Sequence, residues 1–166
     1  NVLKNTLGLS LYSSDLSIDA EVSAFEDLDK ENSHDKFEFI FPRVDLVKKI
    51  KNNTSLDGNF LFKSNNVIKS YQTNIFEKIN INNFIFSSNP KISQKGFYND
   101  YEFIVKNVNT DTDNSKNYKK DQNYYLSGLF QYNTSLPLKK EKNNNLHILK
   151  PKLALKLSPN FMKDLS

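Results

Sequence analysis

From Leu149 to Ser158 the sequence reads LKPKLALKLS, and its four leucines occupy one parity while its three lysines occupy the other. Successive side chains of an extended strand point to opposite faces. The pattern therefore predicts a strand with one apolar face and one cationic face. Two environments fit such a strand: a soluble sheet that packs one face on a core, and a barrel wall between lipid and an aqueous lumen.

The same alternation recurs along most of the chain and predicts seven or eight strands of about 8–13 residues. The segment that follows a polar loop at Asn107–Asn123 is the most regular, and we expect it to pair with the segment at residues 146–158 across the charged connection at 139–145. At Pro42 the apolar parity changes, which predicts a bulge or a strand end. The expected strands include Leu16–Phe25, Phe37–Phe41, Tyr101–Val105 and Tyr124–Leu138.

Strand length favours a membrane barrel. Membrane barrel strands run about 9–11 residues, whereas strands of soluble proteins average about 5–6. We therefore expect an all-β fold, an antiparallel up-and-down meander that forms an open, curved segment of a large transmembrane β-barrel. Because the chain begins at Asn1, we interpret residues 1–166 as a single partial barrel segment of a larger protein.

The composition narrows the function classes. Hydrophobic residues make up 37% of the chain, and no stretch approaches the roughly 18 consecutive apolar residues of a membrane helix. Phe and Tyr, at 13 and 8 residues, suit strands. The absence of Cys excludes disulfides and thiolate metal sites within these residues. A net charge of +4 is too small and too scattered to indicate a nucleic-acid partner.

No catalytic motif is present. His34 and His147 are far apart in sequence, and we expect both to be exposed to solvent rather than bound to metal. The sequence contains no phosphate-binding glycine loop and neither the G-x-S-x-G nor the H-E-x-x-H signature. The sequon at Asn133–Ser135 falls within an expected strand. We therefore expect neither an enzymatic activity nor a cofactor.

One segment imitates the start of a calcium-binding loop. Asp111, Asp113 and Ser115 have the spacing of the first three ligands. Lys116 stands where the turn glycine is needed, and Gln122 stands where the bidentate glutamate is needed. A solvated loop is the better interpretation.

The alternation assigns a facing to the last two expected strands. If the sheet is a barrel wall, one parity faces lipid: Leu126, Phe130, Tyr132, Leu149, Leu153, Leu155 and Leu157. The other parity faces the lumen: Gln131, Asn133, Lys150, Lys152 and Lys156. The lysines form either a solvated strand face or a cationic inner wall beside phosphorylated lipid headgroups, and the sequence leaves both open.

Most of the chain after about Phe37 resembles a known family. The run KNVNTDTDNSKNYKKDQNYYLSGLFQYNTSLPLKK, followed by LKPKLALKLSPNFMKDLS, is similar to the outer-membrane barrel of the LPS-assembly protein LptD family, also called organic solvent tolerance proteins, and especially to its alphaproteobacterial members. The segments that carry the resemblance are Lys106–Thr110, Ser135–Leu138, Lys150–Leu153, Phe37–Ile50 and Gly58–Ile79.

The resemblance implies a function in the bacterial outer membrane. Members of this family form a closed antiparallel barrel that inserts lipopolysaccharide into the outer leaflet among the outer-membrane lipids. A lipoprotein plug, LptE-like, and a periplasmic bridge are the partners that the family implies. Two alternatives stay open: another outer-membrane barrel, such as a porin or receptor, and a soluble β-sandwich or adhesin module. The alternation would look the same in all outer-membrane barrels.

Overall fold

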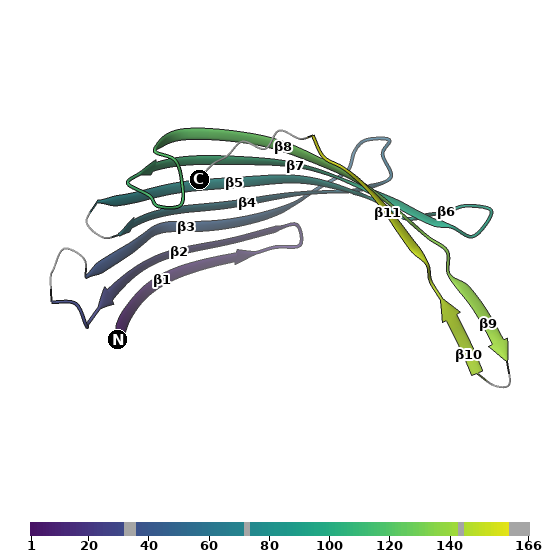
Figure 1. Ribbon diagram of the computed structural model, residues 1–166, viewed down its shortest axis with the longest axis horizontal. Coiled ribbons are helices and arrows are strands. Elements are labelled where there is room, and N and C mark those ends of the chain that lie inside the picture. Colours follow the sequence, from purple (N-terminus) through teal and green to yellow (C-terminus); the bar gives the residue numbers. More distant parts are fainter. Residues whose placement is uncertain (32–35, 72–73, 143–144, 160–166) are drawn as a thin grey trace.

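The chain forms a curved antiparallel sheet and a small projecting ribbon in the computed structural model, which describes residues 1–31, 36–71, 74–142 and 145–159 (Figure 1). No helix within these ranges is long and apolar enough to cross a membrane. The strands are β1 (Val2–Tyr12), β2 (Leu16–Asp27), β3 (Phe37–Ile50), β4 (Gly58–Tyr71), β5 (Ile75–Ser88), β6 (Lys91–Ile92), β7 (Tyr98–Asp113), β8 (Asp121–Ser135), β9 (Leu138–Lys142), β10 (Asn145–Leu149) and β11 (Lys152–Leu157).

The topology is a meander, as the sequence predicted. The strand order in the large sheet is β1-β2-β3-β4-β5-β7-β8-β11, and the short strand β6 pairs with β7. Every pairing is antiparallel. Strands β9 and β10 form a separate two-stranded ribbon that extends past the end of the sheet (Figure 1).

The expected bulge at Pro42 is confirmed. The register of β3 shifts between Ile40 and Arg43 against β4, and the pairing of β3 with β2 shifts at the same level, between Glu21 and Ser23. Proline has no backbone N–H to donate to a ladder, so a bulge is one of the few places where a sheet accommodates it. The strand then continues with the opposite parity to Ile50.

The expected loop at 107–123 is wrong at both ends. Strand β7 continues to Asp113 and β8 begins at Asp121, so that only residues 114–120 connect them. Thr110 and Thr112 lie on one face of β7 and are almost fully buried, opposite Ile79 and Glu77 of β5. β-branched residues favour strands, and this pairing outweighs the local excess of Asn and Asp.

Prolines also divide the two C-terminal strands that the sequence predicted to be continuous. The expected strand at 124–138 ends at Ser135 before Pro137, and the expected strand at 146–158 is interrupted at Lys150-Pro151. Beyond these breaks the chain forms the β9–β10 ribbon, in which Leu149 pairs with Leu138. The sequence predicts no strand before Leu16, yet Val2–Tyr12 form β1.

The pairing register defines two faces of the large sheet. The leucine face carries Leu153, Leu155 and Leu157 of β11, and the lysine face carries Lys152 and Lys156. Residues paired directly across antiparallel strands lie on the same face, so each face can be followed across the sheet. One row on the leucine face runs through Leu9, Ala20, Val44, Asn66, Asn80, Asn109 and Tyr124.

The sheet is a single layer in the part of the chain that the structure describes. The buried hydrophobic side chains there are Phe86 and Val108, at 4% and 9% exposure. By contrast, Leu7 and Leu9 of the edge strand β1 are 76% and 74% exposed. Domains normally bury an apolar face against a second layer, so the leucine face requires a covering that these residues do not supply.

Candidate functional site

Two adjacent rows of the leucine face are aliphatic across β1, β2 and β3. In these rows Leu9 pairs with Ala20, and Leu11 pairs with Ile18. The rows continue onto β3 at Val44 and Leu46. Because the β1 leucines are mostly exposed, this part of the sheet presents a continuous apolar surface. Contiguous exposed apolar surface on this scale marks a contact with lipid or another apolar partner.

Aromatic rings form a band across the leucine face from β4 to β8. Phe60 contacts Phe86 with ring centroids 4.8 Å apart, and Phe86 contacts Tyr101 at 5.6 Å. Tyr101 in turn lies 6.3 Å from Phe130. These separations lie in the range of favourable aromatic pairs. Aromatic girdles also flank the apolar band of membrane barrels, so the band has the composition that a membrane interface selects.

Between the aromatic band and the far ends of the strands lies a group of polar side chains on the same leucine face. We call this group the amide cluster. Its members come from β4, β5 and β7 and hydrogen bond to one another across the strands. They are Ser64, Asn66, Asn80, Asn82, Asn107 and Asn109.

The amide cluster is nearly self-sufficient in hydrogen bonds. Asn80 Oδ1 accepts from Asn82 Nδ2 at 2.5 Å and from Asn109 Nδ2 at 2.9 Å, while Asn80 Nδ2 donates to Asn66. Asn107 Nδ2 donates to the Tyr125 carbonyl oxygen at 3.3 Å as well as to Asn109 Oδ1. Polar groups removed from water are costly unless they are paired. The network therefore lowers the free-energy cost of placing amides on an otherwise apolar face.

The amide cluster is not among the sites predicted from the sequence, although the spacing of its residues is a signal for it. Ser64 and Asn66, Asn80 and Asn82, and Asn107 and Asn109 are each two residues apart. Polar residues at that spacing share one strand face. The sequence instead predicts a loop at Asn107–Asn123, which hides the strand position of Asn107 and Asn109. The six side chains come together only through the register between strands, which the spacing within each strand does not determine.

The pairing register groups most of the predicted site residues on two faces of the sheet. Leu126, Phe130, Tyr132, Leu153, Leu155 and Leu157 lie on the leucine face. Gln131, Asn133, Lys152 and Lys156 lie on the lysine face. Leu149 does not share the leucine face, because it belongs to the β9–β10 ribbon. Lys150 lies between β10 and β11.

A hollow of about 360 Å³ lies where β8, β11 and the start of β7 meet, and we call it the lysine hollow. It is lined by Asp100, Asn133, Thr134, Ser135, Lys150, Lys152, Leu153 and Ala154. In the register, Lys152 pairs with Ser135, and Ala154 pairs with Asn133. The predicted residues Lys150, Lys152 and Asn133 therefore come together at one place, on the lysine face of the sheet edge.

The polar groups of the lysine hollow are only partly paired. Asn133 Nδ2 donates to Asp100 Oδ1 at 2.7 Å and Asn133 Oδ1 accepts from Gln131 Nε2 at 2.8 Å. The Lys150 ammonium lies 5.9 Å from the centre of the Tyr98 ring, a cation–π distance. Within the described residues, Lys152 and Lys156 have no ion-pair partner.

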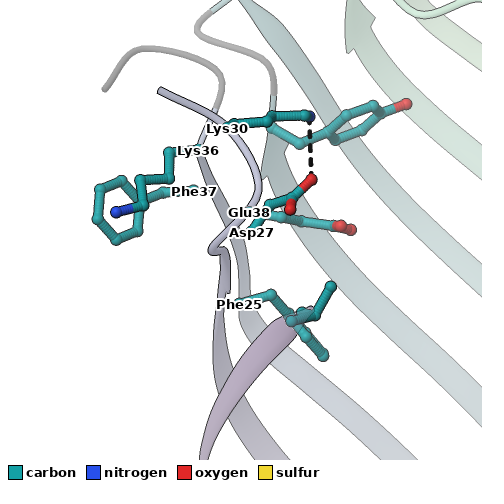
Figure 2. A pocket seen from close by; sticks show the side chains of 8 residues that line it. Phe25, Asp27, Lys30, Lys36, Phe37 and Glu38 are labelled. Atoms are coloured by element: carbon teal, nitrogen blue, oxygen red, sulfur yellow. Dashed lines mark ion pairs between the residues drawn. The ribbon is translucent and has the colours of Figure 1, made fainter. Parts of the chain in front are cut away.

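A smaller pocket of about 140 Å³ lies at the opposite end of the sheet, between the ends of β1, β2, β3 and β4 (Figure 2). Lys30 forms an ion pair with Asp27 at 3.7 Å there, drawn as a dashed line, and Lys36 pairs with Glu26 at 2.7 Å. Figure 2 shows the Lys36 and Lys30 side chains pointing to opposite sides. Opposite charges thus already satisfy each other, and the pocket is too small to hold a lipid.

The calcium-like segment does not assemble a metal site. Asp113 forms an ion pair with Lys120 at 3.3 Å, and Ser115 Oγ donates to Glu77 at 2.6 Å. Glu77 is buried at 4% exposure and also accepts a hydrogen bond from the Tyr71 hydroxyl at 3.0 Å. No cluster of three or more His, Asp or Glu side chains suited to a metal occurs in the described ranges. His147 lies exposed in β10, and His34 falls outside the described residues.

Comparisons with known proteins find no match: no protein family, no curated protein and no solved structure aligns with the chain.

Proposed function

We propose that this chain is part of the wall of an outer-membrane β-barrel that inserts lipopolysaccharide into the outer leaflet, a transport role without catalysis. The observation that carries the proposal is a single-layer meander whose leucine face stays exposed. In water such a face would aggregate or recruit a partner. Lipid covers it without any second layer of protein.

Strand length and facing support the membrane interpretation. The seven long strands of the sheet contain 11 to 16 residues each. A tilted strand of about 9–11 residues crosses the hydrocarbon core, so each is long enough to span and to extend beyond it. The lysine face is the one that would line an aqueous lumen.

The resemblance to the LptD family favours lipopolysaccharide insertion over a porin or receptor. A porin would share the alternation and the aromatic band, so neither separates the two. The cationic row of β11 agrees with a lumen that admits a phosphorylated lipid. The lipoprotein plug and the periplasmic bridge that the family implies are part of this proposal.

The membrane part of the proposal is tested by refolding the purified chain into liposomes and, in parallel, into plain buffer. We expect strand structure, followed by far-UV circular dichroism, to form with lipid only. Protease should then spare the strands and cleave the connections, notably residues 51–57 and 114–120. A cooperatively folded, monodisperse protein in plain buffer would show that the barrel interpretation is wrong.

The lipid is tested with a photoreactive side chain placed on either face. The chain is refolded in liposomes that contain lipopolysaccharide, with the probe at Gln131 on the lysine face or at Phe130 on the leucine face. We expect lipopolysaccharide cross-links from Gln131 and phospholipid cross-links from Phe130. Phospholipid cross-links alone at both positions would favour the generic barrel.

A further inference from the structure

The lysine hollow has the chemistry of an anion site. Lys150 and Lys152 place two ammonium groups at its wall, and Lys152 has no ion-pair partner among the described residues. Asn133 contributes an amide N–H beyond the one given to Asp100, and Ser135 contributes a hydroxyl. Two cations and two neutral donors around one hollow match an oxygen-rich anion.

A small residue creates the space. Ala154 lies on the lysine face between Lys152 and Lys156, opposite Asn133. A longer side chain at this position would project into the same volume that the two lysines border. The hollow is therefore a consequence of side-chain size at one position in a row of long side chains, and it is open to solvent because Ala154 is exposed.

The carboxylate of Asp100 should weaken anion binding at the lysine hollow. Asp100 also lines the hollow, and its Oδ1 accepts from Asn133. The charged side chains in the wall sum to one net positive charge, from two lysines and one aspartate. Asp100 lies on β7 and is paired with Asn133 of β8, the strand between β7 and the β11 lysines. This arrangement predicts that removing the Asp100 charge strengthens anion binding.

We propose that the lysine hollow binds a phosphate group, with the Lys150 and Lys152 ammonium groups as counter-ions and Asn133 and Ser135 as hydrogen-bond donors. The proposed function supplies one source of that group, a phosphorylated lipid headgroup, and a free phosphate ester is the other. The site itself rests on the geometry of β8 and β11 and needs no particular lipid.

The test is calorimetric titration of the chain refolded in detergent micelles. One arm adds inorganic phosphate, and a second adds mixed micelles of phosphatidic acid, with phosphatidylcholine micelles for comparison. We expect Lys152→Gln to weaken phosphate binding about tenfold, the loss of one charge-assisted hydrogen bond. Binding of phosphatidic acid but not of inorganic phosphate would assign the site to a headgroup, and equal binding of both would assign it to phosphate esters in general.

Three further variants separate a built site from general electrostatics. Ala154→Leu fills the hollow without changing charge and should abolish binding, and Asp100→Asn should strengthen it. Lys63→Gln is the matched control, because it removes one positive charge from the same face on β4. An equal loss with Lys63→Gln and Lys152→Gln, or unchanged binding with Ala154→Leu, would overturn the proposal.

Circular dichroism of each variant keeps the two proposals distinguishable. A sheet that folds in plain buffer and still binds phosphate through Lys152 and Ala154 would refute the barrel and retain the site. A sheet that folds only with lipid, and binds no phosphate in either arm, would retain the barrel and refute the site.

Discussion

The leucine face has two halves that differ in chemistry. We call the half on β1 to β3 the aliphatic half, and the rows of paired residues that cross it continue into the amide cluster. The row that begins at Leu9 is aliphatic through Val44 of β3 and becomes Asn66 on β4. The next row does the same, from Leu46 on β3 to Ser64 on β4. The change from hydrocarbon to polar side chains thus occurs between the same two neighbouring strands in both rows.

The two halves are compatible with an apolar environment for different physical reasons. In the two rows through Leu9 and Leu11, each side chain on β1 to β3 is compatible with lipid by itself. In the amide cluster the side chains are compatible only as a network, because an amide without a partner in a low-dielectric medium is costly. A single substitution in the aliphatic half should therefore change only the contacts of that residue. A single substitution in the amide cluster should also deprive the neighbouring amides of hydrogen-bond partners.

The largest effect is expected where the aliphatic half meets lipid. Leu9→Arg should destabilise the refolded chain by about 2–4 kcal/mol if Leu9 lies near the bilayer midplane, because the charge would face hydrocarbon. Ser10→Arg is the matched control, since Ser10 is on the lysine face and hydrogen bonds to Asp19 at 2.6 Å. Urea titrations in liposomes measure both. Equal losses would refute the assignment of the leucine face to lipid.

The amide cluster should respond in the opposite way to added hydrocarbon. Asn80→Leu leaves Asn66, Asn82 and Asn109 short of a partner, and we expect a loss of about 1–3 kcal/mol in the same titration. If the cluster were simply a lipid contact, leucine would stabilise the sheet. Ile68→Leu, on the same face of β4, is the conservative control. A stabilised Asn80→Leu variant would remove the distinction between the two halves.

Fluorescence quenching on β11 can test which face of the sheet is in contact with lipid. The chain has no Trp, so Leu155→Trp and Lys156→Trp each introduce a single tryptophan, on neighbouring residues of opposite faces. We expect brominated lipids to quench the fluorescence at 155 strongly and at 156 weakly. Equal quenching would mean that β11 does not divide lipid from lumen, and the facing predicted for Leu155 and Lys156 would fail.

The alternation allowed the fold to be predicted, but not the details that create the sites. Period-two patterning was sufficient for the meander, for the bulge at Pro42, and for the shared faces of Phe130 and Gln131 with their β11 partners. Pairing between distant strands decides the rest. Asn80 and Asn109 are 29 residues apart, and only the register places them together. The strand breaks near Pro137 and Pro151 could have been predicted from the sequence, because proline interrupts the hydrogen-bond ladder between strands.

The smallest effect concerns the turn that joins β1 to β2. Asp15 lies in this turn, and its carboxylate accepts a hydrogen bond from Lys48 Nζ of β3 at 2.6 Å. This hydrogen bond and the positive charge of Lys48 lower the pKa of Asp15 below its ordinary value of 3.8. A carboxyl group whose pKa is lowered by folding stabilises the folded state above its unfolded pKa. That contribution disappears as the pH falls through the folded pKa.

The contribution should be small, because Asp15 is exposed and screened by solvent. Asp15→Asn should lower the urea midpoint slightly at about pH 6, and its difference from the parent chain should shrink as the pH falls through the folded pKa of Asp15, because the parent side chain then becomes neutral as well. Ser13→Ala in the same turn is the control, since it leaves the Lys48 contact in place. A difference between Asp15→Asn and the parent that grows as the pH falls would mean that Lys48 does not stabilise the Asp15 carboxylate. The β1–β2 turn would then be held to β3 without a contribution from the Asp15 carboxylate, for example through the Lys49 N–H that donates to the Asp15 carbonyl oxygen.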